Sequence, residues 1–360
     1  MKNKKILIDI GHPAHVHQFK YIYRELIKKG YKILFCSKNK EISLYLLEIY
    51  KLPHIMIGKP KKGILNKILN IPISCLKFLR ILIQFKPDII MSRGSIHTSW
   101  TSFLLCKNHI SFADTEHTGL ADILTVPFID IKITANSYNK SLGKNHLRYS
   151  GNIELFYLHP NQYVPDESIL KFLKINKNIN YVIIRFVSWD AYHDFGHYGL
   201  SISDKIKIIN NVAEYARVYI SSESNLPAEL EKYRIKIPCE KMHDALYFAS
   251  LYVGDGGTMA SEAAVLGTPA VYFNSLPLMG YLKEEKEASL LYRVNNRKEI
   301  IEITKKLLIN DSLKKESTNL RNNFIRNKID VTSFVVWFIE NYPESLGIMK
   351  ENPDYQYNFQ

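Results

Sequence analysis

The stretch from Val253 to Pro269, VGDGGTMASEAAVLGTP, decides the fold class of this chain. A short apolar run ends at Gly254, a glycine-rich turn follows, and an alanine-rich helix then extends to Gly267. A strand that runs through a glycine turn into a helix presents free backbone N–H groups at the positive end of the helix, where a phosphate binds well. Glu262 lies about one turn inside this helix, where a carboxylate can reach a ribose hydroxyl. The stretch therefore predicts a nucleotide-sugar site.

Several residues of this stretch are expected to contribute to that site. Thr258 can cap the helix and donate to a phosphate oxygen, whereas Asp255 would repel a diphosphate and is expected to point away from it. A tight strand–helix connection without any ligand is the alternative. The expected donor-binding residues here are Asp255, Gly256, Gly257, Thr258, Met259 and Glu262.

Length and charge limit the class of protein. A chain of 360 residues favours two domains over one. Lys and Arg outnumber Asp and Glu by 48 to 35, a net charge of +13, which suits an anionic partner such as a nucleotide, a lipid headgroup or a lipid-linked acceptor. The excess of positive charge is equally well explained by a chain that is generally rich in Lys, Ile, Asn and Tyr. No nucleic-acid-binding module is recognisable, so nucleic acid is not an expected partner.

The cysteines and the apolar segments favour a cytoplasmic protein. The four cysteines are far apart and form no CxxC pair, which is typical of a reducing compartment. Asp9 interrupts the apolar run at the N-terminus, so this run reads as a first strand and not as a signal peptide. Charged residues also interrupt the most apolar region, 64–91, so it is not expected to span a membrane. The helix expected at 67–85 is either a buried helix between two strands or a face that lies on a membrane surface.

Strands and helices alternate along almost the whole chain. Apolar runs of four to seven residues, such as Lys5–Ile10 and Tyr181–Val187, are separated by segments with helical periodicity. This alternation predicts parallel sheets with right-handed crossovers. We expect an N-terminal Rossmann-like domain at 1–160 on the acceptor side and a C-terminal one at 161–330 on the donor side. Residues 331–360 are expected to form a helix that packs back on the first domain, and a tail.

Unusual polar clusters follow many of these strands. In open α/β sheets, ligands bind outside the carboxyl ends of the strands. The clusters come after Ile10, Met91, Phe112, Val187 and Val253. This placement predicts one composite site in a cleft between the two domains.

The cluster after the first strand of the second domain reads RFVSWDAYHD. Arg185 could balance a phosphate charge, Trp189 could stack on a sugar ring, and His193 and Asp194 could bond the sugar. A loop anchored by buried aromatic residues with a structural Arg–Asp pair is the alternative. All four are expected on the donor side.

Three histidines lie at the first strand–helix turn, GHPAHVH. The spacing of His12, His15 and His17 does not put them on one helix face as HExxH does, and no carboxylate accompanies them, so no metal site is expected. A histidine base for an acceptor hydroxyl fits better, because its pKa lies near the working pH. Alternatively, these histidines only cap the helix or pack in the core. We expect His15 to be catalytic and His12 and His17 to contact the acceptor.

Two further clusters end strands of the first domain. Arg93 and Ser95, in SRGS, could take an anionic group of an acceptor. In DTEH, Asp114 and Glu116 share one face of an extended segment, where they could hold sugar hydroxyls, bind Mg²⁺ or orient a catalytic histidine. We expect Asp114, Glu116 and His117 to be catalytic, with His117, backed by the two carboxylates, as the alternative to His15 as the base. A solvated charged loop is the alternative.

Several segments together resemble a known family. Residues 11–37, GHPAHVHQFKYIYRELIKKGYKILFCS, are similar to the opening of GT-B glycosyltransferases of the peptidoglycan N-acetylglucosaminyltransferase type, whose His-Val pair His15-Val16 would match. KPDIIMSRG at 86–94 resembles a strand and turn of the same type. GDGGTMASEAAVLGTPAV at 254–271 resembles the GT-B donor motif and, equally, a segment of UDP-N-acetylglucosamine 2-epimerases. In both, the helix glutamate binds the ribose, which implies that role for Glu262.

The whole motif set, HPAHVH, DTEH, RFVSWDAYHD and GDGGTMASEAAVLGTP, resembles the domain-of-unknown-function 354 family, a GT-B-like group of prokaryotes often encoded beside surface-polysaccharide genes. The resemblance extends roughly from Lys5 to Ile325. It implies two Rossmann-like domains facing each other across a cleft. The second domain departs from the pattern, since it lacks the Gly-Gly-Ser turn of the peptidoglycan enzyme and the His-Arg-Arg-Glu segment of the epimerases.

The expected function is a metal-independent glycosyltransferase that uses a nucleotide-diphosphate sugar, a UDP-sugar in the first place, and no further cofactor. Its acceptor would be a surface glycan or a lipid-linked sugar, so peripheral contact with the inner face of a membrane is a further expectation. A sugar-nucleotide epimerase or hydrolase, with Asp114, Glu116 or Asp194 moving a proton, is the first alternative. A non-catalytic nucleotide-sugar binding protein is the second.

Overall fold

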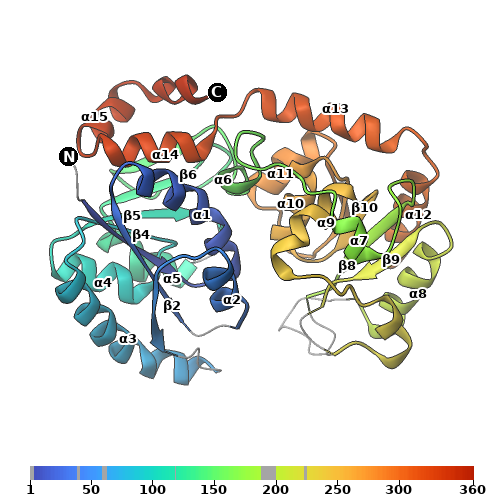
Figure 1. Cartoon of the computed structure of the whole chain (residues 1–360), viewed down its shortest axis with the longest axis horizontal. Helices are drawn as coiled ribbons and strands as arrows, with labels where there is room; N and C mark the ends of the chain where they lie inside the picture. Colours follow the sequence, from blue (N-terminus) through green and yellow to red (C-terminus); the bar gives the residue numbers. More distant parts are fainter. Residues whose placement is uncertain (1–3, 39–40, 59–62, 118, 188–199, 223–224) are drawn as a thin grey trace. The chain divides into compact units, whose positions relative to one another are not determined.

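A computed structural model of the chain describes residues 4–38, 41–58, 63–117, 119–187, 200–222 and 225–360. The chain divides into two compact units (Figure 1). Unit 1 contains residues 1–162 and 328–360, and unit 2 contains residues 163–327. Unit 2 is therefore inserted into the chain of unit 1.

Unit 1 is built on a sheet of seven parallel strands in the order β3-β2-β1-β4-β5-β6-β7. Its strands are β1 Lys5–Ile10, β2 Lys32–Lys38, β3 His54–Gly58, β4 Ile89–Ser92, β5 Asn108–Ala113, β6 Ile131–Ala135 and β7 His146–Tyr149. Its α-helices are α1 Pro13–Lys28, α2 Glu41–Ile49, α3 Ile64–Phe85, α4 Ile96–Leu104, α5 Gly119–Thr125, α6 Leu155–Leu158, α14 Val331–Glu340 and α15 Glu344–Glu351. The central strands are mostly apolar and buried, as both faces of a parallel sheet are covered, but β1 also buries Asp9.

The helices of unit 1 form two layers. The chain runs outward from β1 to β3 and then returns to β4, so right-handed crossovers put α1 and α2 on one face and α3, α4 and α5 on the other. The packing agrees, because α1 contacts α2, α6 and α14, whereas α4 contacts α3 and α5. Leu7, Ile90 and Phe78 meet in the buried core between the sheet and α3.

The C-terminal segment completes unit 1. Phe334 and Phe338 of α14 are fully buried, and Thr332 Oγ1 donates to the carbonyl oxygen of Phe156 at 2.7 Å. Further along, Gln356 accepts a 2.6 Å hydrogen bond from the backbone nitrogen of Ser150. The last segment of the chain thus packs on the first domain, although it contains α15 as well as the one helix expected.

Unit 2 is a second parallel sheet, with five strands in the order β12-β11-β10-β8-β9. Its strands are β8 Tyr181–Arg185, β9 Arg217–Ile220, β10 Leu251–Gly254, β11 Ala270–Phe273 and β12 Leu291–Val294. Its α-helices are α7 Ile169–Leu173, α8 Ile202–Val212, α9 Met242–Phe248, α10 Gly257–Leu266, α11 Gly280–Glu287, α12 Arg297–Leu308 and α13 Leu313–Arg326. The prediction of two parallel-sheet α/β domains is confirmed.

Each sheet reverses its strand order once. In unit 1 the reversal lies between β1 and β4, and in unit 2 between β8 and β10. At such a switch point the two connecting loops leave the sheet in opposite directions and open a ligand-sized crevice at the carboxyl edge. The motifs GHPAHVH and SRGS follow β1 and β4, and RFVSW and GDGGT follow β8 and β10. Topology thus pairs these motifs within each unit.

Candidate functional site

The start of α10 is the candidate phosphate-binding element of unit 2. Gly256 is the residue before the helix, with φ −90° and ψ 115°, and Gly257 is the first helical residue. Thr258 is exposed in the first turn and is not the capping residue that the sequence predicted, because the helix begins two residues earlier. With glycine at both positions, neither residue adds a side chain of its own beside the first N–H groups of the helix. A Cβ atom at Gly257 would already lie 3.3–3.4 Å from side-chain atoms of Tyr281, Leu282 and Met279.

Gly254 is required for packing and not for ligand approach. It lies opposite Arg185 in the parallel register of β10 and β8. A Cβ atom at Gly254 would lie 2.4 Å from the carbonyl oxygen of Arg185 and 2.4 Å from the hydroxyl of Tyr252. Only glycine therefore allows the two strand ends to meet at the switch point.

Asp255 points toward the loop after β8. Its Oδ1 accepts a 2.8 Å hydrogen bond from the backbone nitrogen of Val187. Burial raises the pKa of this carboxyl, although the bond from Val187 opposes the shift. The side chain ties the two switch-point loops of unit 2 together.

Glu262 is buried on α10 and is held by a residue that the sequence analysis did not single out. His243 Nε2, on α9, lies 3.1 Å from Glu262 Oε1, and both side chains are less than a tenth exposed. The ring of Tyr163 packs edge-on against that of His243, with the centroids 6.5 Å apart. His243 thereby fixes the position of the carboxylate that the resemblance assigns to the ribose.

Of the remaining residues expected on the donor side, two lie within the described residues and three lie outside them. Arg185 ends β8, and its Nη1 donates to Ser221 Oγ at 3.0 Å, after the neighbouring strand β9. Met259 is partly buried in the first turn of α10. Trp189, His193 and Asp194 lie outside the described residues.

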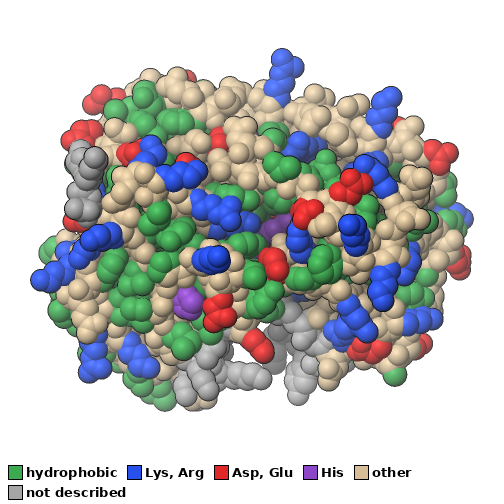
Figure 2. All heavy atoms as spheres, in the orientation of Figure 1, with side chains coloured by type: hydrophobic (Ala, Val, Ile, Leu, Met, Phe, Trp, Pro, Cys, Tyr) green, Lys and Arg blue, Asp and Glu red, His purple; other side chains and the backbone are tan. Residues whose placement is uncertain are grey.

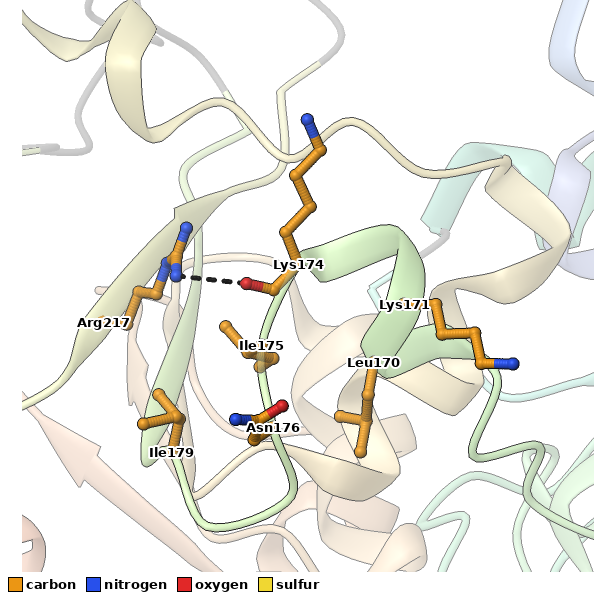
Figure 3. Close-up of a pocket in the computed structure, with 7 residues that line it drawn as sticks. All are labelled: Leu170, Lys171, Lys174, Ile175, Asn176, Ile179 and Arg217. Atoms are coloured by element: carbon orange, nitrogen blue, oxygen red, sulfur yellow. Dashed lines mark hydrogen bonds between the residues drawn. The ribbon is translucent and has the colours of Figure 1, made fainter.

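A pocket in unit 2 lies away from these motifs. It has a volume of about 400 Å³ and is lined by residues of α7, the following turn and the start of β9 (Figure 3): Leu170, Lys171, Lys174, Ile175, Asn176, Ile179 and Arg217. Arg217 is the first residue of β9, so the pocket belongs to the amino-terminal edge of the sheet. We therefore do not assign it to the nucleotide.

A buried carboxylate organises the switch point of unit 1. Asp9 is 3% exposed and accepts hydrogen bonds from Ser95 Oγ and, at 2.8 Å, from Thr98 Oγ1. His97 Nε2 lies 3.3 Å from the same carboxylate. Burial alone would raise the pKa of Asp9, but His97 and the two hydroxyl groups outweigh it and hold the pKa well below its usual range. The hydroxyl of Ser95, which was expected to contact the acceptor substrate, thus donates a hydrogen bond to Asp9.

His15 faces this cluster from the first turn of α1. Its Nδ1 accepts a 3.1 Å hydrogen bond from the backbone nitrogen of Gly11, so a neutral ring carries its hydrogen on Nε2. Burial and the nearby charge of Arg93 lower the pKa of His15 well below its usual value. The ring is therefore neutral at pH 7. His12 caps the same helix, because its Nδ1 accepts a 3.2 Å bond from the nitrogen of Ala14.

Arg93 and Asp114 form an ion pair across the ends of β4 and β5. Their side chains are 14% and 19% exposed, and Arg93 Nη1 also donates to Gln18 Oε1 at 3.1 Å. Burial would raise the pKa of Asp114, but the guanidinium of Arg93 overcomes it and lowers the pKa. The ion pair of Arg93 and Asp114 and the neutral ring of His15 therefore lie near one another at the carboxyl edge.

Two expectations for unit 1 are wrong in their geometry. Glu116 does not share a ligand-holding face with Asp114, because β5 ends at Ala113; Glu116 Oε1 instead accepts bonds from Asn139, at 2.7 Å from the backbone nitrogen and 3.1 Å from Nδ2. His17 is buried, and its ring packs against Tyr50 and Tyr157. His117 is exposed in the segment after Glu116.

Some functional candidates were missed from sequence. Asp9 and His97 are central to unit 1, and His243 holds Glu262 in unit 2. The available signal for Asp9 was a carboxylate inside a buried strand, ILIDIG, which requires hydrogen-bond donors. His243 stands in an ordinary short helix, and nothing local marks it. Among the described residues, no three His, Cys, Asp or Glu side chains are grouped as metal ligands.

Neutral histidines make unit 1 sensitive to acid. Burial lowers the pKa of His109 to about 3 and that of His146 to about 4, and it lowers that of His15 as well. Between pH 6.5 and about 4 the unfolded chain binds protons that the folded unit does not. The free energy of unfolding therefore falls as pH falls, by up to about 1.4 kcal/mol per pH unit for each such proton.

Urea denaturation of the protein at pH 7, 6, 5 and 4.5 measures this slope. His146→Gln, which keeps an acceptor for the backbone nitrogen of Leu142, should reduce the slope by about one proton at pH 5. A free energy of unfolding that does not change between pH 6.5 and 4.5 contradicts the assignment of neutral buried rings.

Comparison with known proteins agrees with this architecture. The sequence model of the family described as "Protein of unknown function (DUF354)" matches residues 4–334. An uncharacterized protein of Methanocaldococcus jannaschii, MJ0665, is 26% identical over 315 residues, which cover 84% of this chain and 91% of that protein.

Three solved structures illustrate the likeness in fold. The structure of S. aureus MnaA with UDP has a TM-score of 0.68 at 13% identity and covers 95% of this chain and 97% of its own. The UDP-GlcNAc 2-epimerase of Neisseria meningitidis with UDP-GlcNAc has a TM-score of 0.67 at 15% identity, covering 94% and 100%. MurG of Acinetobacter baumannii has a TM-score of 0.59 at 14% identity, covering 94% and 99%. The chain therefore has the GT-B fold and belongs to the DUF354 family.

Proposed function

We propose that the chain is a glycosyltransferase that moves a sugar from a UDP-sugar to a surface-glycan or lipid-linked acceptor without a metal ion. One observation carries the proposal: at the switch point of unit 2, a helix that starts at two glycines also carries a buried carboxylate that His243 holds in place. A diphosphate and a ribose need such a pair of groups. The UDP and UDP-GlcNAc in solved structures of similar fold support this choice of donor.

Unit 2 supplies the donor side of the proposed reaction. The N–H groups at Gly256, Gly257 and Thr258 would bind the diphosphate, and they would also stabilise it as the leaving group, which makes a metal unnecessary. Glu262 would accept from the ribose hydroxyls. Asp255 would not repel the diphosphate, because its side chain is engaged by Val187.

Unit 1 supplies the acceptor side, with His15 as the base. The lowered pKa keeps the ring neutral, which a base requires, although this pKa lies further from the working pH than was expected from the sequence. The bond from Gly11 selects the tautomer with hydrogen on Nε2, so accepting a proton there first requires the other tautomer. That change loses one hydrogen bond of about 1 kcal/mol, which is small beside the gain from base catalysis. Arg93 would hold an anionic group of the acceptor.

Turnover with a panel of UDP-sugars tests the proposal. We expect UDP release that depends on an added oligosaccharide or lipid-linked acceptor and is unchanged by EDTA. Release or conversion without acceptor, with solvent deuterium at C2 of the sugar, would instead identify an epimerase or hydrolase. A UDP-sugar that binds without turnover would identify a binding protein.

Two variants on α9 and α10 measure the donor site by itself. We expect Glu262→Gln to weaken UDP binding about 10- to 100-fold, since hydrogen bonds to a charged group contribute roughly 1.5–3 kcal/mol. His243→Phe keeps an aromatic ring against Tyr163 but releases Glu262, and about a fivefold loss is expected. Calorimetric titration with UDP gives both values, and His54→Phe in β3 is the matched control. Unchanged affinity in Glu262→Gln contradicts the ribose assignment.

A further inference from the structure

Helix α3 has two unlike faces. Its inner face packs on the sheet through Phe78, Ile81 and Leu82. On the opposite face, Leu69, Ile73, Leu76 and Ile83 are exposed by 72%, 51%, 61% and 56%. Their spacing of four, three and seven residues places them on one stripe. A helix that covers a sheet in water normally presents polar side chains on this face.

The exposed apolar surface continues on the two neighbouring helices. α4 packs against α3, and α5 packs against α4. The α3–α5 patch consists of the large exposed apolar residues of these helices: Ile68, Leu69, Ile73, Leu76, Ile83, Trp100, Phe103, Leu104, Leu120 and Ile123. Figure 2 shows hydrophobic and basic side chains over the area that Figure 1 gives to α3 and α4. Such a concentration on one layer of a monomer marks a contact surface.

The charge of the chain around α3 and α4 is mostly positive, and the acid of α5, Asp122, lies 3.8 Å from Lys140. From residue 59 to 107 the sequence contains nine Lys and Arg residues and a single acid, Asp88. Asp88 lies after the end of α3 and not on its exposed stripe, and its carboxylate accepts a 2.7 Å hydrogen bond from the backbone nitrogen of Lys5. Lys77 and Arg80 are exposed beside the apolar stripe of α3. The patch is thus apolar with a basic flank.

We propose that the α3–α5 patch docks on a bilayer surface that contains anionic phospholipid. Apolar side chains flanked by Lys and Arg match the acyl boundary and the anionic headgroups of such a surface. A two-fold contact with a second copy fits less well, because it would place the same basic flanks opposite each other.

The helix lies on the surface and does not cross it. Residues Ile68–Phe85 are long and apolar enough to span a membrane by length and composition alone. However, the inner face of α3 is part of the core of unit 1, and spanning would remove it from the sheet. Docking exposes only the outer stripe to lipid.

The docked helices lead to the candidate acceptor edge. α3 and α5 follow the parallel strands β3 and β5, so both helices begin at the carboxyl edge of the sheet, where His15 and Arg93 lie. A lipid-linked acceptor would then be presented at the edge that uses it; this point alone rests on the proposed function.

Vesicle sedimentation with the full chain tests the docking. We expect binding to vesicles of 7:3 phosphatidylcholine and phosphatidylglycerol, at least tenfold weaker binding to phosphatidylcholine alone, and weakening in high salt. The triple variant Leu69→Gln, Ile73→Gln and Leu76→Gln should lose at least tenfold in binding. The matched control changes three exposed apolar residues of unit 2, Val164→Gln, Phe172→Gln and Ile309→Gln, and should bind as the unmodified chain does.

The outcomes separate docking from folding and from catalysis. The thermal melting curve and the circular dichroism spectrum of each variant show that it is folded, and sedimentation needs neither UDP binding nor turnover. Equal vesicle binding by the two triple variants overturns the proposal. A second result would also overturn the proposal: the unmodified chain does not bind vesicles and is a dimer by light scattering, whereas the α3 variant is a monomer.

Discussion

Gly254→Ala lowers the free energy of unfolding of unit 2 by about 3 kcal/mol, an expectation that rests on overpacking at the switch point. The added Cβ would lie 2.4 Å from the carbonyl oxygen of Arg185, which is backbone within a strand and cannot turn aside. One of the two strands must shift, and the loops that carry Val187 and Gly256 shift with it. Urea denaturation followed by circular dichroism measures the loss, and UDP binding should fall with it.

A second glycine provides the control for this variant. Gly347 is exposed on α15, and a Cβ there would meet nothing within 4 Å. Gly347→Ala should therefore raise stability by roughly 0.5–1 kcal/mol, as alanine does in a helix. If Gly254→Ala is as stable as the unmodified chain, the close approach of β8 and β10 is not what requires glycine.

His15→Ala is expected to lower kcat about 10²- to 10⁴-fold while the affinity for UDP stays unchanged, because a general base contributes about that factor. His15→Gln separates two roles of the ring. Glutamine can accept from the nitrogen of Gly11 and donate to a substrate oxygen, but it cannot take a proton. If His15 is the base, both variants fail alike; if it only donates, His15→Gln keeps most of the activity.

Neighbouring histidines supply the controls for this measurement. His12→Ala removes a helix cap, so it should cost about 1 kcal/mol of stability and little of kcat. His117→Ala tests the other histidine that the sequence offered as base. Normal turnover in both His15→Ala and His117→Ala excludes a base role for either residue.

Much of the fold could be predicted because the signals are local. The buried strand Lys5–Ile10 matches its predicted bounds, and the strand predicted at Tyr181–Val187 ends two residues earlier, at Arg185, since apolar runs between helical patterns have few other interpretations. The polar helix α13 and the short strand β12 were not predicted. Helix α13, LKKESTNLRNNFIR, buries only a few side chains, so its pattern resembles a solvated loop.

For the candidate site, the positions of the residues at the sheet edge could be predicted better than the residues with which they interact. Topology places Arg93 and Asp114 at one edge, and the sequence located both residues there. It could not tell that they pair with each other, or that Glu116 turns away to Asn139, since such contacts depend on where unrelated segments meet in space. His243 was not predicted for the same reason, because its role depends on its contact with Glu262 on another helix.

The insertion of unit 2 within unit 1 sets an order of events during synthesis. Residues 163–327 leave the ribosome before residues 328–360, so unit 2 has its whole chain while unit 1 still lacks α14. Until then the face of α1 and α6 that receives Phe334 and Phe338 is uncovered. Because exposed apolar surface on an incomplete domain promotes aggregation, the nascent chain is most prone to aggregate during this interval of its synthesis. A premature stop after unit 2 would leave the chain in that condition permanently.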